Sequence, residues 1–341
     1  MPFFPVFRLI FRLPPLYYTL NITGSSLPSN LSPVKPNGRS NRRPPHPEPE
    51  HPLMCDSACE HGLLPKRHDR LICIDSDGTV FDTMTAKHRC FLGCLIRCFG
   101  FDGDDAGRVS EIWNLVNLHS VHRGENRFRS LLLVFDILRE RGVAVPDTSR
   151  LRDWTAREPC LGNPALQALL EHEFSEEMSL IYRWSRESDE AITANVYGVP
   201  PFPYVRETLA RASEAADILV VSHTPCATLE REWTEHGIAR YAMCLGGQEC
   251  GSKTAQIRNA SNGKYPPERI LVIGDSFGDM NAAAANRALF FPIIPGCETD
   301  SWRELANEGL ARFSDGRFSE RYQKGLLNAF HDALRDDILR K

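Results

Sequence analysis

Short apolar runs alternate with helix-periodic segments around residues 71–74 and again from residue 205 onwards. Runs rich in Val, Ile, Leu and Phe that end abruptly at polar residues or glycine are typical of buried parallel strands. Because such strands alternate with segments of helical periodicity, the sequence predicts a doubly wound parallel sheet of the α/β class. We expect strands at residues 71–74, 218–221, 241–245, 269–273 and 289–294.

A long segment with a purely helical pattern separates the first of these strands from the second. Phe91, Leu95 and Phe99 recur at four-residue spacing, and no strand-like alternation follows them up to about residue 199. Clustered prolines in residues 198–204 then stop the helices and stiffen the return of the chain. Helices are expected at residues 84–99, 107–119, 126–141, 164–183, 188–196, 205–215, 226–236, 301–313 and 319–339, and from near Lys253 and Met280.

The pattern divides the chain into three parts. Residues 1–66 are expected to form a disordered N-terminal extension, because Pro, Asn, Ser and Arg dominate much of it and cannot bury enough apolar surface. Prolines and arginines interrupt its first twenty residues, so we expect neither a membrane span nor a clean signal peptide. A transit peptide is a weaker alternative to a disordered tail or a translated upstream extension, and Met54 stays open as an alternative start. We assign residues 67–83 and 203–341 to the α/β core and residues 84–202 to an all-helical cap.

Net charge and cysteine content limit the binding partners and the cellular location that we expect. The net charge of −4 gives no bulk attraction to nucleic acid, no segment is expected to enter a membrane, and the oligomeric state stays open. The 11 cysteines have no regular spacing and lie mostly in apolar or helical segments, which favours reduced thiols and a cytoplasmic location. Cys55, Cys59 and His61 lack the spacing of common zinc sites, and we interpret them as incidental.

Polar side chains with catalytic potential follow the predicted strands. Because the carboxyl ends of parallel strands meet at one edge of a sheet, we expect these side chains to converge there. Taken singly, a serine can be a helix N-cap, a lysine a surface residue and an aspartate part of a turn, but their joint order disfavours those structural explanations. The residues are Asp75 and Asp77, Ser222, Lys253, and Asp275 and Asp279.

These residues resemble, in order and context, the motifs of the haloacid dehalogenase-like (HAD) phosphohydrolase superfamily. DSDGT at residues 75–79 resembles its first motif, DxDxT, and GDSFGD at residues 274–279 its fourth, GDxxxD. Ser222 stands for the second motif and Lys253 for the third. The resemblance covers residues 68–341, and the inserted helices resemble the cap of one large subgroup. It implies a Rossmann-like core and a phosphatase acting on a small phosphorylated metabolite.

Phosphoryl transfer depends mainly on positioning and charge neutralisation, and a carboxylate can attack phosphorus to form an aspartyl-phosphate. We expect Asp75 to be this nucleophile and Asp77 to carry protons to the leaving alcohol and from water. Mg²⁺ takes oxygen ligands, expected here from the carboxylates of Asp75 and Asp275. By resemblance, the backbone carbonyl of Asp77 is a third ligand, and Asp279 supports the ligands around the metal.

Lys253 and Ser222 are expected to bind the phosphate, together with the backbone amides around Ser76 and Gly78. Lys87 and His88 follow on the first cap helix and are candidate substrate contacts. Arg123, Asn126 and Arg127 open another cap helix and are weaker candidates for an anionic substrate.

Three alternatives stay open. A phosphomutase of the same superfamily places a histidine on the first cap helix, and His88 lies one position away. A phosphonate hydrolase needs a cap lysine, for which Lys87 is the candidate. A non-catalytic scaffold that binds a partner through its cap is disfavoured because every motif carboxylate is present. A dehalogenase is also disfavoured, because Asp77 is present.

Overall fold

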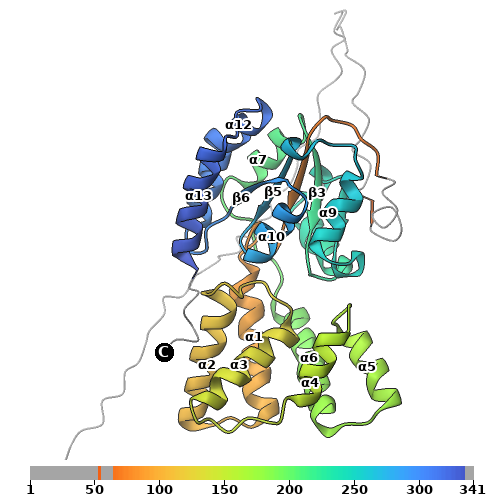
Figure 1. The fold of residues 1–341 in the computed structure, drawn as a ribbon, viewed down its shortest axis with the longest axis vertical. Helices are drawn as coiled ribbons and strands as arrows, with labels where there is room; N and C mark the ends of the chain where they lie inside the picture. The colour runs from red at the N-terminus through yellow and green to blue at the C-terminus, as the bar shows by residue number, and fades with distance from the viewer. Residues whose placement is uncertain (1–52, 55–63, 335–341) are drawn as a thin grey trace, which may run out of the picture. The chain divides into compact units, whose positions relative to one another are not determined.

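The computed structural model describes residues 53–54 and 64–334, which contain one sheet of six parallel strands (Figure 1). Its order, β1-β4-β3-β2-β5-β6, confirms the predicted doubly wound α/β class. The chain leaves β2 towards β3 on one side and later returns to pair β5 on the other, so the strand order reverses beside β2. The strands are β1 Leu53–Met54, β2 Leu71–Ile74, β3 Asp217–Val221, β4 Cys244–Gly246, β5 Ile270–Gly274 and β6 Leu289–Pro292.

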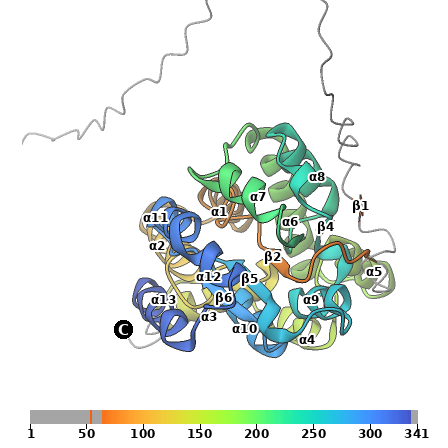
Figure 2. The ribbon, with the colours of Figure 1, turned by 90° about the horizontal axis from the view of Figure 1, so that it is seen from above.

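Helices cover both faces of this sheet (Figure 2). Successive strand residues point to opposite faces, and on β2 Ile72 and Ile74 face one layer whereas Leu71 and Cys73 face the other. The first layer contains α7 Val205–Ala212, α8 Cys226–Glu235, α11 Glu298–Glu304 and α12 Leu310–Ser314. The second contains α9 Lys253–Ser261, α10 Phe277–Ala285 and α13 Glu320–Ala333. We call the sheet with these helices the sheet domain.

Six helices between β2 and β3 form a second apolar core, and we call them the helical insertion. Their core is rich in large aromatic side chains, including the fully buried Trp113 and Trp184. The first helix ends at Gly100, whose φ of 72° gives the left-handed cap that glycine adopts without strain. The helices are α1 Thr83–Phe99, α2 Gly103–Leu118, α3 Arg127–Glu140, α4 Ser149–Arg157, α5 Asn163–His172 and α6 Glu176–Asn195.

Several element boundaries differ from the sequence prediction, most of them by a few residues. The predicted helix at residues 164–183 is wrong, because α5 ends at His172 and Ser175 caps a new helix by accepting a hydrogen bond from the N–H of Met178. This new helix, α6, then runs on through residues 184–187, which the prediction left as a gap. The predicted strand at residues 241–245 starts later, because residues 239–241 form a 3₁₀ turn (η1 Ala239–Tyr241).

The N-terminal prediction fails where the structure describes that region. Leu53 and Met54 were expected to be disordered, yet they pair with Cys244 and Leu245 as the edge strand β1. Leu64, also in the predicted extension, is buried in the sheet domain. Residues 1–52 and 55–63, including the cysteines and histidine weighed as zinc ligands, lie outside the described residues.

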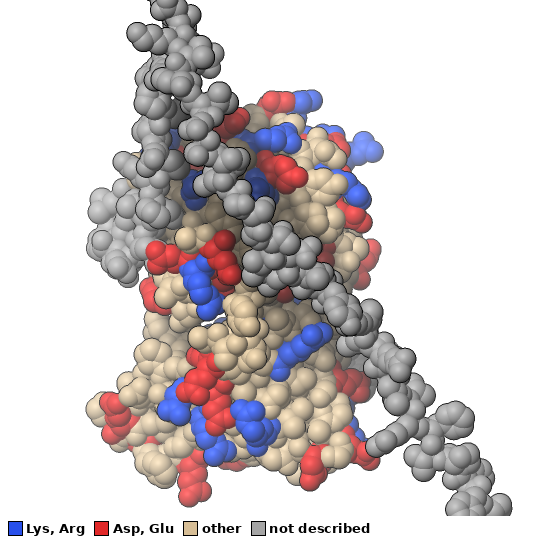
Figure 3. Space-filling view, turned by 180° about the vertical axis from the view of Figure 1, so that it is seen from behind, with Lys and Arg blue, Asp and Glu red and all other residues tan. Residues whose placement is uncertain are grey.

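Three further observations bear on the cysteines, membrane association and surface charge expected from the sequence. Cys250 is disulfide-bonded, so the expectation of reduced thiols is wrong at that residue. Among the helices in the described ranges, none is both long and apolar enough to cross a membrane. On the face shown in Figure 3, acidic and basic side chains are interspersed, which agrees with the small net charge.

Candidate active site

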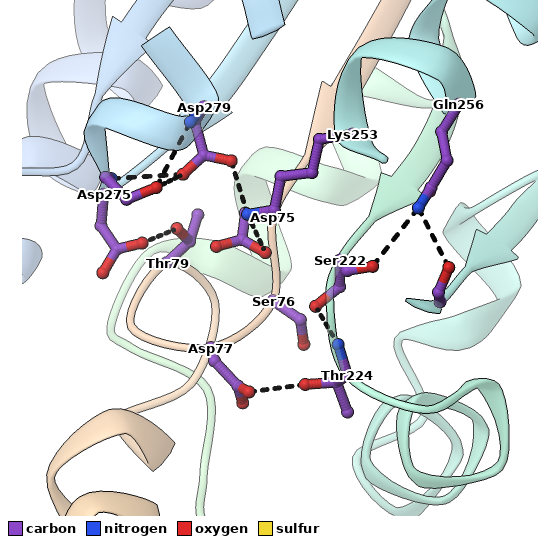
Figure 4. A network of polar contacts seen from close by, with 12 residues as sticks. Asp75, Ser76, Asp77, Thr79, Ser222, Thr224, Lys253, Gln256, Asp275 and Asp279 are labelled. Atoms are coloured by element: carbon purple, nitrogen blue, oxygen red, sulfur yellow. Dashed lines mark hydrogen bonds and ion pairs between the residues drawn. The ribbon is translucent and has the colours of Figure 1, made fainter. Parts of the chain in front are cut away.

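The predicted catalytic residues meet at the carboxyl edge of the sheet (Figure 4). Asp75 follows the central strand β2, Asp275 follows β5 and Ser222 follows β3, while Lys253 is the first residue of α9. Because β2 pairs with both β3 and β5, Asp75 lies between the other groups. The site therefore occupies the place where the strand order reverses, which is where open α/β sheets bind ligands.

Lys253 joins two of the buried carboxylates. Its Nζ lies 3.0 Å from Oδ1 of Asp75 and 2.7 Å from Oδ1 of Asp279. Asp279 is fixed by a capping box with Ser276, whose N–H and hydroxyl both donate to its Oδ2. Burial raises the pKa of Asp75 well above its ordinary value, and the charges of Asp279 and Asp275 add to this, whereas Lys253 opposes it. Burial lowers the pKa of Lys253, but Asp279 and Asp75 outweigh it, so the ammonium stays charged.

Asp275 is held by groups from outside its own strand. Its Oδ1 accepts a hydrogen bond from Thr79 (3.0 Å), and its Oδ2 accepts one from Nε of Arg123 (2.7 Å). Burial raises the pKa of Asp275, and Arg123 opposes this. Gly78 packs so closely that a Cβ there would lie 2.2 Å from Oδ2 of Asp275, and its φ is +76°. Only glycine fits this turn without displacing the carboxylate.

Asp75, Asp275 and Asp279 form a compact carboxylate cluster. One oxygen from each lies within 4.8 Å of the others, and all three residues are buried. Buried carboxylate oxygens are the donors that hard divalent cations prefer, and Mg²⁺ is bound through one or two carboxylates plus substrate phosphate. The residues present therefore fit such an ion.

The carboxylate of Asp77 makes a separate set of contacts. Its Oδ1 accepts hydrogen bonds from Nζ of Lys87 (2.6 Å) and from the hydroxyl of Thr83, and its Oδ2 accepts one from Thr224 (2.6 Å). Burial opposes ionisation, but Lys87 and the two hydroxyls outweigh it and hold the pKa of Asp77 below its ordinary value. The resting site thus presents Asp77 as an anion with a fixed orientation.

Two residues of the turn predicted to bind phosphate, Ser76 and Gly78, make hydrogen bonds inside the protein. The hydroxyl of Ser76 accepts a hydrogen bond from Nε1 of Trp233 (3.0 Å), and the N–H of Gly78 donates to the carbonyl of Phe81 (2.8 Å). The Gly78 amide thus has a partner inside the protein, and its role in binding phosphate stays a prediction. Ser222 is buried, and its hydroxyl accepts a hydrogen bond from the N–H of Thr224 (3.2 Å), which leaves its own proton to donate.

A cavity of about 400 Å³ opens above these residues. Asp75, Asp77, Ser222 and Lys253 line it from the sheet domain. The helical insertion contributes the opposite wall, whose members include Met84, Lys87, His88, Phe91, Arg127 and Asp189. A cavity with Asp75 on one side and a mixed polar and apolar wall on the other suits a small ligand.

Both predicted cap residues, Lys87 and His88, line this cavity in different environments. Lys87 is buried and reaches Asp77 as well as Glu232, whose Oε1 lies 3.3 Å from its Nζ. The ring of His88 packs against Phe91 and Trp113. Burial, reinforced by Arg123, lowers the pKa of His88 to about 3, so the ring is neutral.

The sequence did not reveal three contacts of this site. Arg123 was weighed only as a substrate contact, whereas it pairs with Asp275 in the structure. Glu232 belongs to no recognised motif. It joins the site because α1 places Lys87 beside it on α8. Thr224 lies two residues after Ser222, and a hydroxyl so close to a strand end is a signal that the sequence does contain.

No protein-family model matches the sequence, and no curated protein matches it. Solved structures that resemble the chain include a protein from Bacteroides fragilis named as a haloacid dehalogenase-like hydrolase. The two sequences are 18% identical, the similarity covers 69% of this chain and 93% of that chain, and the TM-score is 0.44. A predicted phosphoglycolate phosphatase from Haemophilus somnus 129pt has 17% identity, coverages of 69% and 96%, and a TM-score of 0.43. CbbY from Rhodobacter sphaeroides, in complex with phosphate, has 15% identity, coverages of 70% and 96%, and a TM-score of 0.39. At these identities and TM-scores, the similarities assign neither an activity nor a substrate to this chain.

Proposed function

We propose that the chain is a HAD-like phosphatase that hydrolyses a small phosphate monoester through an aspartyl-phosphate on Asp75, with Mg²⁺ as its cofactor. The observation that carries this proposal is the position of Asp75. Its buried carboxylate lines the cavity, 3.0 Å from Lys253 and within the cluster that includes Asp275 and Asp279. A nucleophilic carboxylate, a fixed cation and a candidate metal site thus share one edge of the sheet.

Lys253 has two tasks in this mechanism. A carboxylate that attacks a phosphate dianion needs positive charge nearby, and the Lys253 ammonium supplies it beside Asp75. It also opposes the effect of burial, which raises the pKa of Asp75. The hydroxyl of Ser222 supplies a hydrogen-bond donor to the phosphate at the edge of the same cavity.

Asp77 would move the protons. Three donors orient its carboxylate, and it lines the cavity beside Asp75, so it can accept a proton from the water that attacks the aspartyl-phosphate. To deliver a proton to the leaving alcohol, Asp77 would first have to take one up from solvent or from the phosphate ester, because its resting carboxylate is ionised. Thr83 and Thr224 fix which oxygen faces the reacting atoms.

Asp75 and Asp275 would hold Mg²⁺ through their carboxylates, with Asp279 completing the cluster. The backbone carbonyl of Asp77 as a further ligand remains an expectation from the family resemblance. When bound, the ion would neutralise charge on the phosphate and orient it towards Asp75.

Two enzymatic alternatives fit the contacts less well. A phosphonate hydrolase needs a neutral lysine as nucleophile, but although burial lowers the pKa of Lys87, Asp77 and Glu232 outweigh it and keep the ammonium charged. A phosphomutase needs a polar group that steers Asp77, and His88 packs against aromatic rings instead. Lys87 takes the contact with Asp77.

Hydrolysis of an aryl phosphate by the full chain, with Mg²⁺ and with a chelator, tests the proposal. We expect Mg²⁺-dependent turnover, an acid-labile phosphoenzyme in the wild type, and loss of both in Asp75→Asn with the fold intact by circular dichroism. Asp82→Asn is the matched control, because it removes an exposed carboxylate seven positions further along the chain. Turnover by Asp75→Asn near the wild-type rate, or a wild type that hydrolyses no phosphate ester, would contradict the proposal.

A further inference from the structure

The helical insertion places a cation on the candidate metal site. Arg123 lies in the loop between α2 and α3 (residues 119–126), and its Nε is 2.7 Å from Oδ2 of Asp275. Both side chains are buried, at 6% and 2% exposure. The guanidinium is anchored from behind by a hydrogen bond from its Nη1 to the carbonyl of Leu118 (3.1 Å). This contact therefore joins the loop to the edge of the sheet at the carboxylate that is best placed to bind a metal.

The negative charge of the Asp275 carboxylate is balanced by its ion pair with Arg123. Lys253 forms ion pairs with Asp75 and Asp279. Among the described residues, Asp275 forms its ion pair with Arg123. A buried carboxylate without a cation is strongly destabilising, so some positive charge has to occupy this position. Arg123 is that charge when no metal is present.

A divalent ion and Arg123 cannot share the carboxylate comfortably. Oδ1 of Asp275 accepts a hydrogen bond from Thr79 and Oδ2 accepts one from Arg123, so a metal ion would have to share its ligand oxygen with a hydrogen-bond donor. The three clustered carboxylates carry three negative charges, which a divalent ion and Lys253 together balance. With Arg123 in place as well, the buried site would carry an excess positive charge, and repulsion between cations is strong at low dielectric.

We propose that Arg123 is an internal counterion of Asp275 that competes with the divalent metal, so that metal binding releases the α2–α3 loop from the sheet edge. The inference rests on the metal site of the proposed function, but not on phosphatase activity. Gly124, Glu125 and Asn126 of the same loop line the cavity. Displacement of Arg123 would therefore move part of the cavity wall and link metal loading to access by the substrate.

Metal affinity tests the competition directly. Titration of the full chain with Mg²⁺ in a calorimeter should show tighter binding by Arg123→Met than by the wild type, by about ten- to a hundredfold, the range expected when a charged hydrogen bond no longer has to be broken. Arg129→Met is the matched control, because it removes the same charge from an exposed position on α3, and it should bind Mg²⁺ like the wild type. Equal or weaker binding by Arg123→Met, or no binding by either protein, would overturn the proposal.

Hydrogen exchange of the wild type gives a second readout that needs no variant. Two turn hydrogen bonds, from the N–H of Arg123 to Ser120 and from that of Glu125 to His122, hold the loop. Saturating Mg²⁺ should accelerate exchange of these two amides while it slows exchange around Asp75. Slower or unchanged exchange of the loop on metal binding would overturn the proposal. Because neither readout involves hydrolysis, both decide the competition whether or not the chain cleaves a phosphate ester.

Discussion

Lys87, on the first helix of the insertion, donates a 2.6 Å hydrogen bond to Oδ1 of Asp77 at the end of β2. The same ammonium lies 3.3 Å from Oε1 of Glu232 on α8. The buried Lys87 ammonium thus pairs with two acids. Asp77 acts in the proposed mechanism, whereas Glu232 has no proposed chemical role. Glu232 then stabilises the charged form of Lys87, and Lys87 in turn fixes Asp77.

Replacing Lys87 by Met should destabilise the protein, because Glu232 would stay buried without its nearest cation. Removing one partner of a buried ion pair costs about 3–5 kcal/mol. The double variant Lys87→Met/Glu232→Leu should recover part of this loss in urea unfolding, because it removes one of the two carboxylates that Lys87 neutralises and leaves Asp77. If the destabilisations of the two single variants simply add, Lys87 and Glu232 are not coupled. Catalysis should stay impaired in the double variant, since Asp77 still lacks Lys87.

Asp77→Asn should separate the two half-reactions. Loss of a general acid or base costs about a hundred- to ten-thousand-fold in rate, and less when the leaving group needs no proton. Formation of the phosphoenzyme should therefore slow much more for alkyl phosphates than for activated aryl phosphates, whereas its breakdown should slow for both. The aspartyl-phosphate should then accumulate with the aryl substrate, as rapid-quench measurement would show. Equal slowing of both substrates without accumulation would reduce Asp77 to a structural role.

The sheet and the convergence of Asp75, Lys253 and Asp279 could be predicted because they depend on local sequence. The run at residues 71–74 is bounded by polar groups, and its strand has the predicted limits. Parallel strands place their carboxyl ends at one edge, so residues after different strands meet without any need to know the packing. Ser276 and Asp279 form the helix cap that their spacing favours.

The contacts made by the insertion could not be predicted in this way. Arg123 and Asp275 are 152 positions apart, and their pairing depends on how the loop after α2 packs on the sheet edge. No periodicity encodes that packing. The break before Ser175 was missed for a different reason, because the apolar pattern continues across it and only the cap stops the helix.

His88 should make stability depend on pH. Burial, with Arg123, lowers its pKa to about 3, so the folded protein keeps the ring neutral while the unfolded chain protonates it near its ordinary value of 6.5. The stabilising contribution is therefore fully present above pH 6.5 and is lost progressively as the pH falls towards 3. Each pH unit in this window costs about 1.4 kcal/mol for one proton.

Comparison of His88→Phe with the wild type isolates this contribution. Phe keeps a ring against Phe91 and Trp113 and does not titrate. Denaturant unfolding between pH 4 and pH 7 should show a shallower loss of stability in the variant than in the wild type. Parallel curves would show that His88 is not the group that titrates in this window.

The far wall of the cavity gives a test of substrate selection. Asp189 lies 2.5 Å from Nη1 of Arg127 and accepts a hydrogen bond from Nδ2 of Asn163 (2.7 Å), and all three residues line the cavity. Arg127 is further fixed over the ring of Phe91, with its guanidinium 4.7 Å from the ring centre. The charge of Arg127 is therefore neutralised by Asp189 before any substrate arrives.

Asp189→Asn should shift the preference of the enzyme towards substrates with a second negative charge. The amide keeps the shape and one of the two accepted hydrogen bonds, and it leaves the positive charge of Arg127 facing the cavity uncompensated. Asp189 is 43% exposed, so the electrostatic gain is limited to about 1 kcal/mol, or roughly fivefold. The kcat/KM for phosphoglycolate, relative to ethyl phosphate, should rise by about this factor. Asp153→Asn removes an exposed acid from α4 and should leave the ratio unchanged. A constant ratio in Asp189→Asn, or the same change in both variants, would show that Asp189 does not control the charge of the cavity wall.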